Sequence, residues 1–182
     1  MEFRVYLRAL EPDDYKTTIE WRKEDEVWNN LIGPRRYVSS DTEKRWVERS
    51  ILEHEKGERF RFIVCKKETN EVIGLFSVSN IDLLNKKCEP SSIISPGERG
   101  KGYVFEARLL VFHYLYSQLG IERIEARIME TNNSMLKAGK KFGYYFEGKQ
   151  RMAVYKNGEQ KDLLLFSMLK SEFYDKYGEL FK

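Results

Sequence analysis

Three glycines and two cations are packed into the front half of the segment SPGERGKGYVFEARLLVFHYL, residues 95–115. The glycines are Gly97, Gly100 and Gly102, and the cations between them are Arg99 and Lys101. The back half of the segment is apolar at helical spacing. The start of a helix exposes unpaired N–H groups and a partial positive charge, and glycines let that backbone approach a ligand closely. The segment therefore predicts an anion site, most naturally for phosphate.

The common phosphate motifs fit this segment only in part. A P-loop needs a lysine and a hydroxyl after its second glycine, but Tyr103 follows Gly102. A dinucleotide-binding fingerprint needs a third glycine where Phe105 stands. Gly97 and Gly100 match the GxxG loop of RNA-binding KH domains, but that loop joins two helices, and a strand is expected here. A glycine-rich connection without a ligand is the remaining alternative.

Apolar periodicity, capping residues and turn residues predict the elements that position this loop. Strands are expected at 3–7, 59–66, 72–80, 89–95, 122–129, 144–155 and 160–169, and helices at 12–23, 40–54, 103–119 and 133–142. Ser40 and Glu43 have capping-box spacing, and residues 29–39 are expected to form a loop. The order indicates an α/β fold, with a mixed, mostly antiparallel sheet of about seven strands and helices on both faces. The glycines then lie at the C-terminal edge of a strand, where open sheets favour ligands.

Length and composition limit the classes of function. The 182 residues suit a single domain over 1–182, and a net charge of +3 is small for a nucleic-acid binder. No stretch reaches the ~20 apolar residues that span a bilayer, and the first ten residues lack the apolar core of a signal peptide. Cys65 and Cys88 make no disulfide framework. We therefore expect a soluble, cytoplasmic protein that binds neither nucleic acid nor membranes.

Four segments in the right order resemble the GNAT N-acetyltransferases, especially the branch near ribosomal-protein and spermidine N-acetyltransferases. VIGLFSVSNID is similar to that family's third strand and ISPGERGKGYVFEA to its acetyl-CoA loop, in which Gly100 and Gly102 match the motif. NNSMLKAGKKFGYYFEG is similar to its Asn-led short helix, and MAVYKNGEQKDLLLFSML to its last hairpin. The resemblance covers nearly the whole chain. It implies the GNAT fold and acetyl-CoA as co-substrate, without a metal.

The resemblance also implies which residues bind acetyl-CoA. The pyrophosphate is expected on the backbone of Arg99, Gly100, Lys101, Gly102, Tyr103 and Val104. The pantetheine arm is expected to pair with the strand edge at Ile93, Ile94 and Ser95. Asn132 matches the asparagine that binds this arm, and a helix cap is its alternative role. Lys137 and Lys140 are candidates for the nucleotide phosphates, with simple solvent exposure as the alternative.

Glu89 is the candidate catalytic base. Acetyl transfer to an amine requires that the amine lose a proton and that the tetrahedral oxyanion be stabilised. Aligned on the glycines, Glu89 stands where the family has an acidic residue at the start of its fourth strand. A carboxylate there can accept the ammonium proton directly or through water. The alternative is an exposed glutamate at a strand edge beside Lys86 and Lys87.

The usual proton donors of the family are absent from this sequence. Gly139 stands where many relatives carry a tyrosine, and Met135 where others carry a serine. Ser134 and Tyr144 are near in sequence, but neither matches the pattern. Because a thiol has a pKa of ~8.5, thiolate is a tolerable leaving group without a donor. His54 and His113 with the two cysteines have no metal-ligand spacing.

The predicted activity is direct transfer of acetyl from acetyl-CoA to a primary amine, either a small molecule or a protein N-terminus. The first two helices and the 29–39 loop are expected to build the acceptor site, with the acids Glu20, Glu24, Asp25 and Glu26 available to attract a cation. A non-catalytic acyl-CoA-binding module is the main alternative, and RNA binding through the GxxG is the second. Exposed strand edges are compatible with a homodimer.

Overall fold

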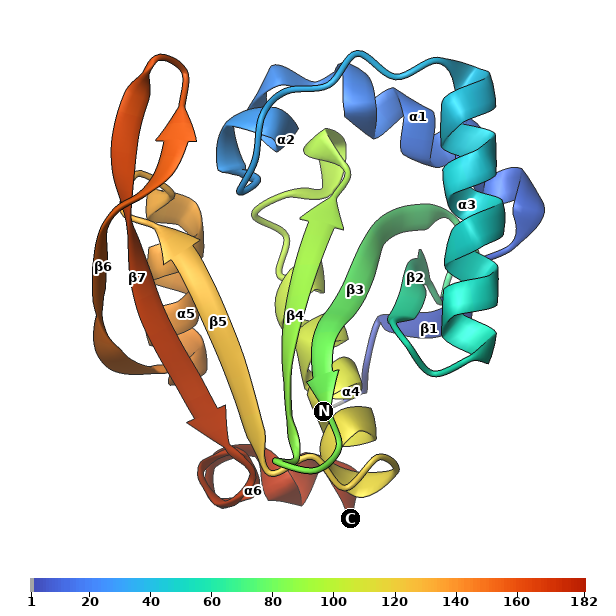
Figure 1. Cartoon of the computed structure of the whole chain (residues 1–182). Helices are drawn as coiled ribbons and strands as arrows, with labels where there is room; N and C mark the ends of the chain where they lie inside the picture. The colour runs from blue at the N-terminus through green and yellow to red at the C-terminus, as the bar shows by residue number, and fades with distance from the viewer. Residues whose placement is uncertain (1) are drawn as a thin grey trace.

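Seven strands form one sheet in the order β1-β2-β3-β4-β5-β7-β6 in the computed structural model, which describes residues 2–182 (Figure 1). The strands are β1 (Val5–Ala9), β2 (Phe60–Lys66), β3 (Val72–Asp82), β4 (Lys87–Ile94), β5 (Arg123–Met129), β6 (Tyr145–Lys156) and β7 (Glu159–Leu169). All neighbours are antiparallel except β4 and β5. The predicted mixed, mostly antiparallel sheet is confirmed.

Within residues 2–182, six α-helices and three short 3-10 turns connect or follow the strands. The α-helices are α1 (Tyr15–Lys23), α2 (Asp25–Asn30), α3 (Ser40–Glu55), α4 (Tyr103–Ser117), α5 (Asn133–Phe142) and α6 (Lys170–Tyr177). The 3-10 turns are η1 (Pro12–Asp14), η2 (Pro96–Glu98) and η3 (Gly178–Phe181). In Figure 1, α1 and α3 lie on one side of the sheet and α4 crosses the other.

The two faces of β2 show why helices cover both sides of the sheet. Successive side chains of a strand point to opposite faces. Phe62 and Val64 belong to the core that contains α4, whereas Ile63 and Cys65 belong to the core that contains α1 and α3. All four are buried, so this part of the strand is apolar without interruption rather than alternating. The predicted helices on both faces are confirmed.

The parallel neighbours β4 and β5 separate after a short contact. Only Lys87 with Arg123 and Cys88 with Ile124 pair. Beyond these residues the two strands diverge, as Figure 1 shows between the yellow-green arrow of β4 and the light-orange arrow of β5. An unpaired strand edge carries free N–H and C=O groups that can pair with another chain or ligand. The remainder of β4 presents such an edge toward β5.

Some predicted elements differ from the structure. Residues 12–14 form the turn η1 before α1, and the first strand runs over 5–9 instead of 3–7. The extended backbone of Glu24 (ψ 120°) separates α1 from α2. Helix α2 is not predicted from the sequence, and its last two residues fall in the predicted 29–39 loop. Helix α6 was not expected. Its buried Phe173 and Tyr177, four residues apart, carry the helical periodicity that would have indicated it.

The start of α3 corrects the predicted capping box. Ser39, not Ser40, is the N-cap, and its hydroxyl accepts from the Thr42 N–H at 3.1 Å. Glu43 does not reach back to the cap. It is 1% exposed, and its carboxylate accepts from Arg22 Nε on α1 at 3.2 and 3.3 Å. The polar residue that sequence spacing assigned to a cap therefore joins two helices.

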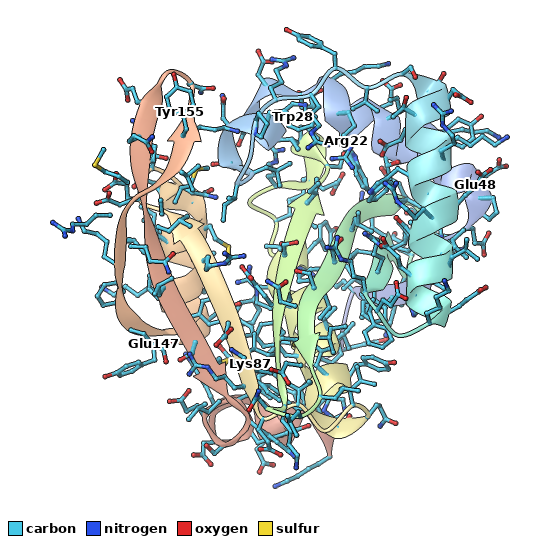
Figure 2. All side chains as sticks on the ribbon, in the orientation of Figure 1. Arg22, Trp28, Glu48, Lys87, Glu147 and Tyr155 are labelled. Atoms are coloured by element: carbon cyan, nitrogen blue, oxygen red, sulfur yellow. The ribbon has the colours of Figure 1, made fainter. Side chains whose placement is uncertain are left out.

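Arg22 also connects these helices to α2. Its guanidinium lies over the rings of Trp28 and Trp46, and its carbonyl accepts from Trp28 Nε1 at 2.6 Å. Figure 2 shows Arg22 and Trp28 close together beneath the N-terminal helices. This cluster fixes α2 relative to α1 and α3.

Replacing Glu43 with alanine is expected to destabilise the protein by about 3 kcal/mol, because it leaves the Arg22 charge without its buried partner. The midpoint of thermal unfolding should fall by roughly 10 °C. Glu48→Ala on the same helix is the matched control, since Glu48 is exposed (Figure 2). Equal midpoints for the two variants would show that the Arg22 contact contributes nothing.

Candidate active site

A cavity of about 580 Å³ lies where β4 and β5 diverge. Residues of α2, β4, the glycine loop, α4, β5 and α5 line it. The volume is in the range of small-molecule sites. Segments that range from residue 26 to residue 144 therefore meet at one concave site, and the loop singled out from the sequence is one of them.

The glycine loop, which lines this cavity at Gly100 and Gly102, carries a row of free main-chain donors. Gly100 and Gly102 have φ of 76° and 90°, the left-handed region that favours glycine, and α4 begins at the next residue. Within residues 2–182, the five N–H groups from Gly100 to Val104 have no hydrogen-bond acceptor. Five consecutive donors at the start of a fifteen-residue helix make an anion-binding arrangement.

The two cations of the loop are already paired. Arg99 forms an ion pair with Glu26 of α2 and donates to the Ile94 carbonyl at 3.2 Å. Lys101 contacts Glu98 at 3.2 Å, and its side chain does not line the cavity. The pKa of Glu98 is lowered mainly by its hydrogen bond with Lys66. The main-chain N–H groups, rather than these side chains, are thus the free donors of the loop.

Arg4, the residue just before β1, holds the loop in place. Its guanidinium donates to the carbonyl of Lys101 and to the carboxylate of Glu106, which is 5% exposed on α4. The same guanidinium lies 4.7 Å from the centroid of the Tyr103 ring. These contacts hold the first turn of α4 in place before any ligand arrives.

The free edge of β4 is offset by one residue from the prediction. The Ser95 N–H donates to the Ile73 carbonyl of β3 at 2.9 Å, and neighbouring residues alternate in direction. The main-chain groups of Ser92 and Ile94 therefore face the cavity, whereas those of Ile93 and Ser95 face β3. The pantetheine pairing predicted for Ile93, Ile94 and Ser95 stays a prediction, and the main-chain directions favour Ser92 and Ile94 for it; Ile93 also lines the cavity.

Asn132 is the N-cap of α5. Its Oδ1 accepts from the Met135 N–H at 3.1 Å and from the Ser134 hydroxyl at 2.9 Å. The residue also lines the cavity. Both roles considered from the sequence are thus compatible: the carbonyl oxygen caps the helix, while the amide nitrogen is left to donate. Lys137 and Lys140 are exposed and lie outside the cavity lining.

Glu89 lies in the cavity wall and bridges the diverging strands. Its side chain is 14% exposed, and both carboxylate oxygens accept from Arg127 of β5 at 2.9–3.1 Å. Asn80 Nδ2 donates to Oε2 at 2.8 Å. The hydrogen bond with Glu89 raises the pKa of Arg127. Glu89 is therefore neither an isolated buried carboxylate nor an exposed edge residue beside lysines. Arg127 holds it, and no pattern in the sequence indicated this arginine.

Glu89 Oε1 keeps the capacity to accept a proton from a substrate. A carboxylate has about four lone-pair sites. In residues 2–182, Oε2 accepts from Asn80 and from two Arg127 nitrogens, whereas Oε1 accepts only from Arg127 Nε. The ion pair therefore orients the carboxylate and leaves one oxygen less occupied.

Tyr144 fills the space beside Gly139. A Cβ at position 139 would lie 2.9 Å from Tyr144 Cδ2, so a larger residue there requires the ring to move. The ring stacks on Phe112 with centroids 6.2 Å apart and lines the cavity. Burial raises the pKa of Tyr144. This phenol, and not a residue at 139, lies in the cavity wall on this side, while Tyr103 lines the cavity from the start of α4.

Lys156 attaches the segment after α2 to the last hairpin. The side chain of this β6 residue is buried, and Nζ donates to the carbonyls of Leu31 at 3.1 Å and Gly33 at 2.6 Å. Burial lowers the pKa of Lys156. Leu31 and Ile32 line the cavity, so this lysine helps to position the predicted acceptor side. No local signal in the sequence indicated that role.

The acids proposed for the acceptor side are mostly paired. Glu20 accepts from Lys23, Asp25 pairs with Arg35, and Glu26 pairs with Arg99. Of this group, only Glu26 lines the cavity. Their charges are therefore largely compensated, by Lys23 of α1, by Arg35 after α2 and by Arg99 of the glycine loop.

Nucleophilic and metal chemistry find little support in the described part of the chain. Burial raises the pKa of the Cys88 thiol to about 12, so the nucleophilic thiolate is suppressed. His54 bonds to the Arg61 main chain, and His113 stacks on Phe181. No group of three or more His, Cys, Asp or Glu in residues 2–182 is placed to hold a metal ion. Over the same range, no helix combines the length and apolar character needed to cross a membrane.

The fold and the site together define a class of protein. It has an open sheet in which an anion-binding helix start and a free strand edge meet in one cavity. Comparison with known proteins identifies the family. Residues 4–145 match the acetyltransferase (GNAT) domain. The chain therefore belongs to the GNAT acetyltransferase family, which confirms the resemblance found in the sequence.

Relatives and solved structures agree with this assignment. The chain is 27% identical over 172 residues to the SPbeta prophage-derived uncharacterized N-acetyltransferase YokL of Bacillus subtilis, covering 94% of this chain and 93% of that protein. It is 22% identical over 166 residues to the ribosomal-protein-serine acetyltransferase of Escherichia coli, covering 90% and 91%. The structure of spermidine N-acetyltransferase from Vibrio cholerae in complex with CoA and spermine matches with a TM-score of 0.84 at 20% identity, over 93% and 98% of the two chains. The prediction of an enzyme of this class is confirmed.

Proposed function

We propose that this protein transfers the acetyl group of acetyl-CoA directly to a primary amine. The observation that carries the proposal is the row of free N–H groups from Gly100 to Val104 at the cavity in the divided sheet. A pyrophosphate fits such donors at a helix start. The amides of a pantetheine arm fit the edge of β4 at Ser92 and at the Ile94 N–H, as an added strand would, while the Ile94 carbonyl already accepts from Arg99.

Glu89 is proposed to receive a proton from the acceptor ammonium, which converts it to the nucleophilic amine. Its Oε1 lies in the cavity wall, and Arg127 and Asn80 fix its orientation. A base must lie within hydrogen-bond reach of the proton or one water away from it. The amine then attacks the thioester carbonyl without a covalent enzyme intermediate, in agreement with the suppressed thiolate of Cys88.

The acceptor is proposed to be a small-molecule amine or the amine of a protein N-terminus. The relatives named above include one enzyme named for a ribosomal protein and one named for spermidine, so both classes occur among similar proteins. We propose that the acceptor enters beside α2 and the Leu31–Ile32 segment, which Lys156 holds. A homodimer stays a prediction.

A turnover assay tests this proposal. Release of free thiol from acetyl-CoA should depend on an added amine, and mass spectrometry should find one acetyl group on the acceptor nitrogen. The panel should contain spermidine, an amino sugar and peptides that begin with serine or alanine. Binding of acetyl-CoA without turnover of any amine would contradict the enzyme and favour the non-catalytic acyl-CoA-binding module.

A further inference from the structure

Arg108 differs from every other charged residue that lines the cavity. The other charged lining residues are Glu26, Glu89, Glu98, Arg99 and Arg127. Each of these forms an ion pair, whereas Arg108 has no carboxylate within ion-pair distance in residues 2–182. Arg108 is only 3% exposed. A buried charge without a partner is strongly unfavourable, so a ligand that supplies a negative charge would relieve the cost.

The contacts of Arg108 stabilise the cation without neutralising it. Its Nη2 donates to the thioether sulfur of Met135 at 3.3 Å, and its guanidinium lies 5.2 and 5.7 Å from the ring centroids of Phe142 and Tyr144. A thioether is a weak acceptor, and aromatic faces attract a cation only modestly. Among residues 2–182, no other acceptor meets its side chain, which has five N–H donors.

The position of Arg108 in α4 places it deeper in the cavity than the anion-binding loop. It follows the N-cap Gly102 by six residues, about 9 Å along the helix axis. Opposite it stand α5 and Tyr144, and the ring of Tyr144 fits there because position 139 has no side chain. The cavity thus has two regions that can bind an anion. One is the row of main-chain N–H donors at its start, and the other is the guanidinium farther in.

We propose that Arg108 binds the negative charge that develops on the sulfur of coenzyme A as the acetyl group leaves. This inference rests on the proposed function. With the pyrophosphate on the loop and the arm along β4, the sulfur is the far end of the ligand and lies in the inner part of the cavity. Thiolate is the anion that the reaction itself produces there.

The amine nitrogen forms a bond to the thioester carbon, and the C–S bond breaks with its electron pair moving to sulfur. Before the attack the ammonium loses one proton to Glu89 or to water, and after the C–N bond forms the nitrogen loses a second proton to solvent. An N–H group of Arg108 donates to the thiolate, which solvent protonates after release. A preorganised donor of this kind favours the developing charge more than it favours the neutral thioester.

The neighbouring titratable groups keep their protonation between about pH 7 and 8.5, where the free thiol titrates. They are Tyr144, Tyr177 of α6, Cys88 of β4 and His113 of α4. Burial raises the pKa of both phenols and of the thiol, and lowers that of His113. The ion pair of Glu89 with Arg127 lines the cavity from β4 and β5, and Glu106 of α4 pairs with Arg4, the residue before β1.

The test compares CoA with desulfo-CoA, which lacks the thiol, by calorimetry across this pH range. If Arg108 favours the thiolate, the bound thiol ionises at lower pH than the free thiol. The affinity of CoA relative to desulfo-CoA should then rise about tenfold from pH 7 to 8.5 in the wild-type protein. The ratio removes any pH effect that the two ligands share.

Two variants assign the effect to the guanidinium. Arg108→Met should remove the rise and lower kcat about 10²-fold, while acetyl-CoA binds within a few fold of wild type. Arg108→Lys should keep part of the rise. If Arg108→Met does not fold, the wild-type ratio and the lysine variant still decide the question.

The possible failures are distinguishable. A flat wild-type ratio with normal acetyl-CoA binding overturns this inference and leaves the proposed function intact. Absence of acetyl-CoA binding to the wild-type protein overturns both. An Arg108→Met variant with an unchanged ratio and a raised KM for the acceptor would assign Arg108 to an acceptor carboxylate, and it also overturns the inference.

Discussion

Replacing Glu89 with glutamine is expected to lower kcat/KM for acetyl transfer by about 10²- to 10³-fold, the usual contribution of a positioned base. Glutamine keeps an oxygen that can accept from Arg127 and Asn80, so the bridge between β4 and β5 is largely preserved. It cannot accept the ammonium proton. Acetyl-CoA affinity and the unfolding midpoint should therefore remain near their wild-type values while turnover falls.

Glu125→Gln is the matched control for that experiment. Glu125 lies on β5, pairs with Lys87 and Arg123, and does not line the cavity. Figure 2 shows Lys87 near the end where β4 and β5 meet. This variant removes an ion-paired carboxylate near the divergence and should leave turnover within about twofold of wild type. A wild-type rate in Glu89→Gln would remove Glu89 from the proton transfer and leave it a purely structural bridge.

Replacing Gly102 with valine is expected to weaken acetyl-CoA binding by at least about 100-fold. Its φ of 90° is strained for a β-branched residue, and a Cβ there would lie 3.2 Å from Arg4 Nη2. A backbone shift that relieves the strained φ or the close approach to Arg4 also reorients the N–H groups of residues 100–104. These groups then no longer point together at the ligand. Calorimetric titration with acetyl-CoA measures the effect.

The same loop supplies the control for the glycine prediction. Gly97 does not have a left-handed backbone conformation, and nothing lies within 4 Å of a Cβ built there. Gly97→Ala should therefore bind acetyl-CoA within about twofold of wild type. If Gly102→Val also binds normally, the ligand does not depend on the geometry of these main-chain donors.

Local patterns predicted the parts of the site that local conformation determines. Gly100 and Gly102 could be recognised because a left-handed backbone before a helix has few residue types to choose from. Asn132 could be recognised as a cap for a similar reason. The order of strands and helices was sufficient to predict a mixed sheet with the loop at a strand end.

Contacts between distant elements could not be predicted in this way. The pairing of Glu89 with Arg127 depends on how β4 and β5 diverge, which neither strand encodes alone. The Lys156 contact joins β6 to the segment after α2 across more than a hundred residues. Arg108 did leave a signal, since a single arginine interrupts the apolar stretch of its helix. A charge on a helix is usually solvated, so only the structure shows that this one is buried and unpaired.

Calorimetric titration of the wild-type protein with acetyl-CoA tests the central claim most directly, with ATP and NAD as phosphate-bearing controls. The account predicts one acetyl-CoA bound per chain with micromolar affinity and no comparable binding of either control. Such a result would establish acetyl-CoA as the ligand and would justify the amine screen, and the Gly102→Val comparison would assign the binding to the donors of residues 100–104. Absence of acetyl-CoA binding, or equal binding of all three ligands, would contradict the account, because the cavity would then not be an acetyl-CoA site.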